Sequence, residues 1–306
     1  MNSIFSYKKL IIEEGHGKYK PNEFSECSIH LHLPEEQAST NIHDSVGYQL
    51  ETEIQIVVGH GMTHMACIVD LCVQTMFEGE RCTLETKCIS ARSAAADDFV
   101  TLEVTLLSFS AATDLCNISY EEKLKHAVTL KTLGMSAYSA DNLSAAFHKF
   151  SRSLKYFTCA TVDDKPSSLC TGENVLPNGA CASDSSYRVL LSDSDNSNLT
   201  HEDIDRLICH TWLNLAACQL RCQNFKLAAV NCSKALKMDP NNVKGLFRRA
   251  QCNVKTGNEH AAVSDLERAL TLDPGNREII RLLSIARQLT RKSDDKLAAA
   301  MSKMFR

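Results

Sequence analysis

Cysteine and histidine are the side chains of this sequence with the widest range of possible chemistry. The chain has 14 Cys and 11 His among 306 residues. No two cysteines form a C-x-x-C pair, and no zinc-ligand spacing occurs. Cys218 and Cys222 are one helical turn apart, which favours small buried thiols at a helix interface. We therefore expect no cofactor, no metal, and reduced thiols in a cytoplasmic protein, with the nucleus as a second compartment.

Histidines His30 and His32 fall in an alternating stretch, CSIHLHL. Alternation of period two predicts a strand, with Ile29 and Leu31 on one face and the histidines on the other. We interpret both histidines as surface residues of that strand, in preference to catalysts or metal ligands. No catalytic residue is predicted.

Basic side chains are concentrated in the C-terminal part of the chain. Residues 201–306 hold 18 Lys/Arg against 11 Asp/Glu, a net charge of +7, whereas residues 1–200 hold 15 and 26, a net charge of −11. This division favours an acidic partner for the C-terminal part, and solubility is the alternative interpretation. The chain has no Lys/Arg run with interleaved aromatics and no run of eighteen apolar residues, so we expect neither nucleic-acid nor membrane binding.

An internal repeat organises the C-terminal part, from Leu207 to Asn276. A shift of 34 residues places Ala216 on Ala250, Ala228 on Ala262, and Asp239-Pro240 on Asp273-Pro274. Such a period is typical of helix pairs stacked as a solenoid, in which small residues let neighbouring helices approach closely. The stretch resembles the tetratricopeptide repeat (TPR) family.

The resemblance extends to a first unit at residues 120–158, where Gly134 and Ala146 occupy family positions. Residues 159–200 are rich in Ser, Asp, Asn and Gly and are predicted to be a disordered insertion. The second and third units then cover 201–274. A long amphipathic helix over 275–306 is predicted to cap the last unit.

Residues 6–112 are predicted to form a separate, strand-rich domain. Alternating patterns occur in YQLETEIQIVVG, RCTLETKC and FVTLEVTLLSF, and MTHMACIVDLCVQTMFEGE between them has helical spacing that ends near Gly79. One helix on an antiparallel sheet is an α+β arrangement. The predicted fold class is thus α+β, an antiparallel sheet with one helix, followed by an all-α TPR solenoid and a long C-terminal helix.

The strand-rich domain resembles the FKBP family of peptidyl-prolyl isomerases over residues 8–110. The resemblance is carried by IIEEGHGKYKPNEFSECSIHL and by Met76, Gly79 and Glu80 of the M-x-x-G-E turn. Members of that family hold the prolyl ring in an aromatic pocket, which this sequence lacks: its corresponding positions are Leu31, Val69 and Leu102. The departures imply a degenerate FKBP-like domain without enzyme activity, with residual prolyl isomerase activity as the alternative.

The TPR resemblance also implies a site. TPR domains that bind chaperone tails hold the terminal carboxylates with polar residues, called a carboxylate clamp. The resemblance implies that the clamp residues here are Lys131, Asn214, Lys244 and Arg248. Met135 is a doubtful fifth position, since the family usually has Asn there. Lys244 and Arg248 are one turn apart and therefore share a helix face.

The clamp implies the acidic C-terminal tail of an Hsp90-class chaperone as partner, with an Hsp70-class tail left open. We expect a co-chaperone or adaptor of the FKBP-like type with TPR repeats, which bridges the chaperone to client proteins. The alternatives are a weak isomerase anchored to the chaperone and a TPR scaffold for another acidic partner.

Overall fold

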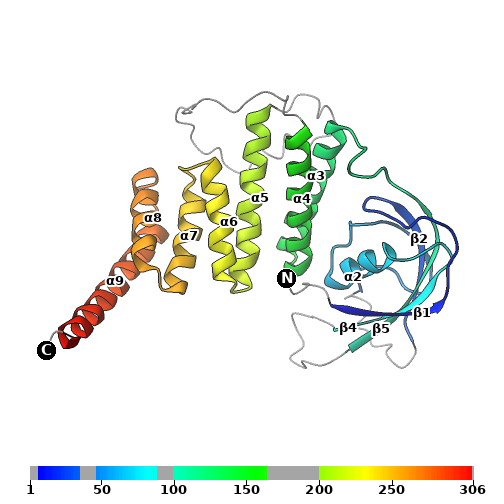
Figure 1. Ribbon diagram of the computed structural model, residues 1–306, viewed down its shortest axis with the longest axis horizontal. Helices are drawn as coiled ribbons and strands as arrows, with labels where there is room; N and C mark the ends of the chain where they lie inside the picture. The colour runs from blue at the N-terminus through cyan, green and yellow to red at the C-terminus, as the bar shows by residue number, and fades with distance from the viewer. Residues whose placement is uncertain (1–5, 35–45, 88–98, 164–199, 305–306) are drawn as a thin grey trace. The chain divides into compact units, whose positions relative to one another are not determined.

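The computed structural model describes residues 6–34, 46–87, 99–163 and 200–304, and its helices and strands carry the labels of Figure 1. The chain divides into two compact units, Met1–Tyr156 and Phe157–Arg306. Each unit is described by itself below. The sequence placed a domain boundary after residue 112, whereas the first helical hairpin groups with the N-terminal sheet in the same unit.

The first unit contains a five-stranded antiparallel sheet with strand order β1-β4-β5-β2-β3. The strands are β1 (Tyr7–Glu13), β2 (Glu26–His32), β3 (Glu53–Val57), β4 (Arg81–Lys87) and β5 (Phe99–Ser110). This sheet, followed by helices, confirms the predicted α+β domain and solenoid.

One face of this sheet forms the core of the first unit. Ile29 pairs with Leu106, and Leu31 pairs with Val104, across the β2–β5 ladder. All four side chains are fully buried, because alternate residues of a strand share a face. Helix α2 (His64–Val73) lies over that face, and Figure 1 shows it inside the curve of the sheet.

Helix α2 is shorter than the sequence predicted. It begins after Thr63, whose side chain accepts a hydrogen bond from the Ala66 N–H, and it ends at Val73 instead of near Gly79. The next backbone bonds run from Thr75 N to Cys72 O and from Met76 N to Val73 O, so the chain leaves the helix in tight turns. Met76 follows the helical spacing in sequence and is buried, but it lies outside the helix.

Helices α3 (Tyr120–Ser139) and α4 (Leu143–Asp163) form the first helical hairpin. A capping box between Ser119 and Glu122 fixes the start of α3. A Cβ atom on Gly134 would lie 2.8 Å from the Phe150 ring, so only glycine permits this close helix contact. Helix α4 continues beyond the predicted end at 158, and the predicted insertion beyond Asp163, residues 164–199, lies outside the described residues.

Side chains from the β1–β2 connection join this hairpin to the sheet. Phe24, in the left-handed region at φ 67°, stacks on His126 with ring centroids 3.7 Å apart and meets the edge of Tyr156. Arg152 of α4 donates two hydrogen bonds, of 2.7 and 2.6 Å, to the carboxylate of Glu23. These contacts explain why the hairpin groups with the sheet.

The second unit is a run of antiparallel helices. They are α5 (His201–Arg221), α6 (Phe225–Met238), α7 (Val243–Thr256), α8 (Glu259–Leu272) and α9 (Arg277–Met304). The alanines that define the 34-residue period are fully buried between successive helices, namely Ala216, Ala228, Ala235, Ala250, Ala262 and Ala269. Small residues thus allow the close helix packing that the repeat predicted.

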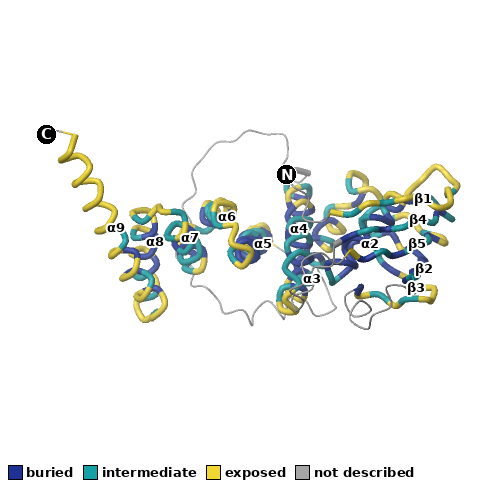
Figure 2. The backbone as a smooth tube through the Cα atoms, turned by 90° about the horizontal axis from the view of Figure 1, so that it is seen from below, coloured by how far each residue is buried: buried dark blue, intermediate teal, exposed yellow. Residues whose placement is uncertain are grey.

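Helix α9 has two different halves. Ile279, Leu283 and Ala286 are buried in one cluster with residues of α7 and α8, so the first half caps the last helix pair. The second half is exposed, and Met304 is 82% exposed. Figure 2 shows this part of α9 in the colour of exposed residues.

Candidate functional site

Two cationic residues of the predicted clamp, Lys244 and Arg248, are positioned by the start of helix α7. The Asn242 side chain accepts a hydrogen bond of 2.9 Å from the Gly245 N–H and donates one of 3.0 Å to Asp239. This cap fixes the first turn of α7, where Lys244 is exposed. Arg248 follows one turn later and is partly buried.

Helix α5 holds the arginine in place. Arg248 Nη1 donates a hydrogen bond of 2.8 Å to the backbone carbonyl oxygen of Leu213, the neighbour of Asn214. A guanidinium has five N–H donors in a planar fork, so this bond leaves donors for an anionic ligand. The structure thus brings Arg248 beside the Asn214 segment, with Lys244 one turn away on the same helix face. We call Asn214, Lys244 and Arg248 the α5–α7 polar face.

The next arginine along the chain has a different role. Arg249 makes two hydrogen bonds, of 2.8 and 2.6 Å, to the buried carboxylate of Asp265 on α8. The hydrogen bond with Asp265 raises the pKa of Arg249. Neighbouring arginines are therefore divided between an internal ion pair and the α5–α7 polar face.

Helix α3, in the first unit, carries the other predicted positions. Lys131 is buried, with 6% of its surface exposed, and Met135 is 39% exposed. Both lie on a different compact unit from the α5–α7 polar face. The complete clamp of Lys131, Asn214, Lys244 and Arg248 therefore stays a prediction.

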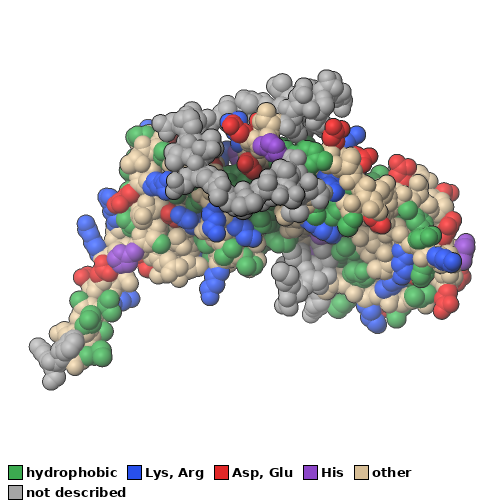
Figure 3. All heavy atoms as spheres, turned by 45° about the horizontal axis from the view of Figure 1, so that its top comes forward, with side chains coloured by type: hydrophobic (Ala, Val, Ile, Leu, Met, Phe, Trp, Pro, Cys, Tyr) green, Lys and Arg blue, Asp and Glu red, His purple; other side chains and the backbone are tan. Residues whose placement is uncertain are grey.

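Positive side chains are frequent around the repeats. Figure 3 shows several Lys and Arg side chains grouped over the helices of the second unit. Lys234 places its ammonium 4.1 Å from the centre of the Trp212 ring, a cation–π contact. Trp212 is partly buried against Cys209, Leu213 and Ala235.

The three positions that the sequence predicts to correspond to an isomerase pocket are buried in this chain. Leu31 on β2, Val69 on α2 and Leu102 on β5 each have 0% of their surface exposed. These side chains pack into the core between sheet and helix, so none of the three presents a surface to a prolyl ring. Their assignment to a degenerate isomerase pocket stays a prediction.

Sequence reasoning missed a buried polar network in the first unit. Asp70 of α2 accepts hydrogen bonds from the N–H groups of Gly59 and Gly61, at 3.0 and 2.8 Å, and from the Tyr48 hydroxyl at 2.7 Å. Lys149 of α4 is fully buried and donates to the Gly59 carbonyl oxygen.

Burial raises the pKa of Asp70, although the Lys149 ammonium and these hydrogen bonds oppose that rise. The sequence signal for this network was the Gly-His-Gly turn after a strand, followed by a lone Asp inside an apolar helix. Its lysine lies 90 residues from Gly59, so no local pattern could connect them.

His30 and His32 on β2 are both half-buried. His32 lies 2.8 Å from Glu51, whose hydrogen bond raises the pKa of that imidazole. Within the described ranges, no group of three or more His, Cys, Asp and Glu side chains could hold a metal ion. Among the helices described, none has both the length and the apolar character needed to cross a membrane.

Comparison with known proteins gives the following matches. The tetratricopeptide repeat model matches residues 243–276. Peptidyl-prolyl cis-trans isomerase FKBP4 of Bos taurus is 25% identical over 305 residues, covering 97% of this chain and 58% of the relative. FK506-binding protein-like of Homo sapiens is 24% identical over 302 residues, covering 98% of this chain and 70% of the relative.

A solved structure, the first TPR of Spaghetti (RPAP3) bound to HSP90 peptide SRMEEVD, is 17% identical with a TM-score of 0.37, covering 55% of this chain and 94% of that one. The chain spans little more than half of the length of bovine FKBP4. Sheet, repeats and relatives agree: the chain joins an FKBP-like N-terminal domain to tetratricopeptide repeats and is homologous to FKBP4.

Proposed function

We propose that this chain is a non-enzymatic co-chaperone or adaptor. Its repeats bind the acidic C-terminal tail of an Hsp90-class chaperone, and the FKBP-like domain serves as a structural partner that presents clients. The observation that carries the proposal is the hydrogen bond between Arg248 and the Leu213 carbonyl oxygen. It holds a guanidinium beside Asn214 before any ligand arrives, which lowers the entropy lost on binding.

The charge of the repeats supports an acidic ligand. Lys244 and Arg248 supply two cations one turn apart, and residues 201–306 have 18 Lys/Arg against 11 Asp/Glu. A terminal carboxylate can accept charge-assisted hydrogen bonds from an ammonium, a guanidinium and an amide together. A chaperone tail, which ends in acidic residues and a free carboxylate, has the required chemistry.

The FKBP-like domain supports the non-enzymatic part of the proposal. Bovine FKBP4 is named a peptidyl-prolyl isomerase, but Leu31, Val69 and Leu102 of this chain are fully buried. A prolyl ring needs an open apolar slot, which these three positions do not provide. In a proline-peptide isomerisation assay, we therefore expect the full chain to give the uncatalysed rate; a rate above background would restore the enzyme alternative.

The test of tail binding is a titration of the full chain with the fluorescently labelled peptide SRMEEVD. Arg248→Ala removes charge-assisted hydrogen bonds worth about 1.5–3 kcal/mol, which weakens binding about ten- to a hundredfold. Lys244→Ala should have a similar effect. Lys237→Ala, an exposed lysine on α6, is the matched control and should bind like the wild type.

Two outcomes would contradict the proposal. Wild-type affinity in both Arg248→Ala and Lys244→Ala would exclude the α5–α7 polar face as the binding site. Absence of peptide binding in the wild type, for both Hsp90-class and Hsp70-class tails, would favour a scaffold for another acidic partner. Circular dichroism of each variant establishes that the repeats stay folded.

A further inference from the structure

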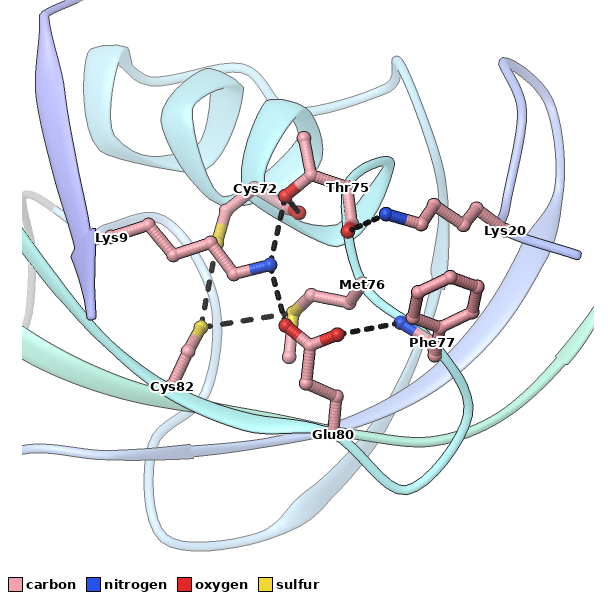
Figure 4. Close-up of polar contacts among 8 residues, drawn as sticks. All are labelled: Lys9, Lys20, Cys72, Thr75, Met76, Phe77, Glu80 and Cys82. Carbon is pink, nitrogen blue, oxygen red and sulfur yellow. Dashed lines mark hydrogen bonds and ion pairs between the residues drawn. The ribbon is translucent and has the colours of Figure 1, made fainter. Parts of the chain in front are cut away.

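A cluster of three sulfur atoms lies in the first unit, apart from the positions discussed above. Cys72 belongs to the last turn of α2, Met76 to the turns after it, and Cys82 to β4. The Cys72 and Cys82 Sγ atoms are 3.6 Å apart, and Cys82 Sγ is 3.9 Å from Met76 Sδ. All three side chains are fully buried. Figure 4 shows their sulfur atoms converging between the helix and the sheet.

The spacing of these sulfurs suits a metal ion between them. A metal–thiolate bond in zinc sites is about 2.3 Å long. Three ligands at about that distance from a central ion, in a trigonal plane, lie about 4.0 Å from one another. The two observed separations, 3.6 and 3.9 Å, are close to this value. These two contacts place the Cys82 sulfur at a suitable distance from each of the other two sulfurs.

The ligand chemistry determines which ion would fit. Two thiolates and a thioether are soft donors, which select Cu(I) over hard cations such as Mg²⁺ or Ca²⁺. Structural zinc sites have four ligands from Cys, His or carboxylates. Such a set is missing here, because no group of three His, Cys, Asp and Glu with metal-site geometry occurs among the described residues.

A lysine provides positive charge at the edge of the cluster. Lys9 of β1 is held by Glu80 Oε1 at 2.5 Å and by Thr75 Oγ1 at 3.0 Å, and Thr75 Oγ1 in turn donates to the Cys72 carbonyl oxygen. The buried Glu80 carboxylate balances the charge of Lys9, so this ion pair orders the edge of the cluster and adds no net charge to it.

We propose that Cys72, Met76 and Cys82 form a buried binding site for a soft monovalent cation, Cu(I). Binding replaces the proton of each thiol with a bond to the metal and releases both protons to solvent. No electron is transferred, because the ion enters and stays as Cu(I). This site is independent of the α5–α7 polar face, which lies in the other compact unit.

The fold offers a route to the buried sulfurs. Strand β1, which carries Lys9, is at the edge of the sheet, and most of its residues are exposed. An edge strand with few buried side chains opens at a lower free energy than the central strands. Displacement of β1 would expose the cluster, so we expect binding to be slow relative to that of an exposed thiol pair.

The experiment is an anaerobic titration of the reduced full chain with Cu(I) against the colorimetric Cu(I) chelator bathocuproine disulfonate. The wild type should hold Cu(I) against the chelator, and Cys72→Ser/Cys82→Ser should bind one equivalent less. Met76→Leu keeps the apolar volume but loses the soft donor, so affinity at this site should fall on the order of tenfold. X-ray absorption should show sulfur neighbours at about 2.3 Å.

Control variants separate this cluster from the other thiols. Cys116→Ser removes an exposed thiol. Cys232→Ser/Cys252→Ser removes a second buried pair, on α6 and α7, whose mutual hydrogen bond raises the pKa of Cys232. Neither change should affect Cu(I) binding at the Cys72–Met76–Cys82 cluster.

Thermal unfolding provides a second measurement, because a ligand that binds only the folded state raises the melting temperature. Cu(I) should raise the melting temperature of the wild type, and should raise that of Met76→Leu less. The proposal is wrong if the wild type releases all Cu(I) to the chelator. It is equally wrong if Cys72→Ser/Cys82→Ser and Met76→Leu, folded by circular dichroism, retain wild-type stoichiometry and affinity.

Discussion

Leu31, Val69 and Leu102 of the FKBP-like domain have no exposed surface, whereas Lys244 of the repeats is exposed and Arg248 directs part of its guanidinium to a backbone carbonyl. Both regions resemble binding sites of known families. In one, the side chains at the predicted pocket positions have no exposed surface. In the other, cations remain at the surface in a fixed arrangement. From this difference in exposure we expect the repeats to bind a ligand and the FKBP-like domain to serve as a structural element.

Substitution of a buried lysine in the first unit should give the largest change in the free energy of unfolding. It tests whether the FKBP-like region acts as a structural element. Lys149→Met keeps a long, unbranched side chain but removes the ammonium that faces Asp70 and the Gly59 carbonyl oxygen. Loss of one partner from a buried charged network lowers the free energy of unfolding by about 3–5 kcal/mol. Urea unfolding measures this change.

Lys155→Met on the exposed side of the same helix is the control and should be nearly neutral. Equal stability of the two variants would show that the Lys149 contact contributes nothing. Tail-peptide affinity should stay unchanged in Lys155→Met, because this substitution is expected to leave the peptide site of the repeats intact.

Acidic pH should lower the free energy of unfolding of the same region. Burial lowers the pKa of His148 on α4 to about 4. The imidazole of the unfolded chain has a pKa near 6.5, so the unfolded state binds a proton first as the pH falls. The contribution of neutral His148 to the free energy of unfolding is therefore complete above about pH 6.5 and is lost as the pH falls toward 4. The loss can reach about 3 kcal/mol at this site.

Neighbouring His60, His64 and His126 also have lowered pKa values, with burial as the main cause of each, and they act in the same direction. Urea unfolding of wild type and His148→Gln at several pH values measures the contribution of His148. The variant should show a shallower fall in stability below pH 6.5. Identical pH profiles would rule out His148 as a source of acid sensitivity.

An aromatic side chain placed at a predicted pocket position tests the FKBP-like region directly. Val69→Trp introduces an aromatic at a fully buried position, and we expect overpacking to lower the free energy of unfolding by about 1–3 kcal/mol. The isomerisation assay should still give the background rate. Leu107→Trp, at a partly exposed position on β5, controls for the added indole. A gain of isomerase rate in Val69→Trp would mean that the site lacks only one ring.

The smallest expected effect concerns the doubtful clamp position on α3. Met135 is 39% exposed, so Met135→Asn leaves the core intact and adds an amide. A hydrogen bond at such an exposed position should contribute about 0.5–1.5 kcal/mol, which would tighten peptide binding about two- to tenfold. Titration of the full chain with SRMEEVD measures it. Unchanged or weaker binding would place Met135 outside the binding surface.

The sequence predicted the elements whose signals are local. Alternation in CSIHLHL located β2, and the 34-residue period located the buried alanines of α5–α8. It placed the end of α2 too late, because Met76 follows the helical spacing but is buried from a turn. Apolar spacing records burial, and burial alone does not separate a helix from the turn after it.

Contacts between distant segments were beyond local patterns. Lys149 and Gly59 are separated by 90 residues, and Cys72 and Cys82 meet across a helix and a strand. Phe24, Glu23 and Arg152 join the first helical hairpin to the sheet, and no local pattern indicated these contacts. Such pairings depend on how the elements pack, which one sequence does not specify.

The most direct test of the proposed function compares two forms of one peptide. The full chain is titrated with SRMEEVD that ends in a free carboxylate and with the same peptide that ends in an amide. If the α5–α7 polar face grips the terminal carboxylate, the amide should bind at least about tenfold more weakly, and Arg248→Ala should reduce that difference. Equal affinity of the wild type for both peptides would contradict the carboxylate clamp.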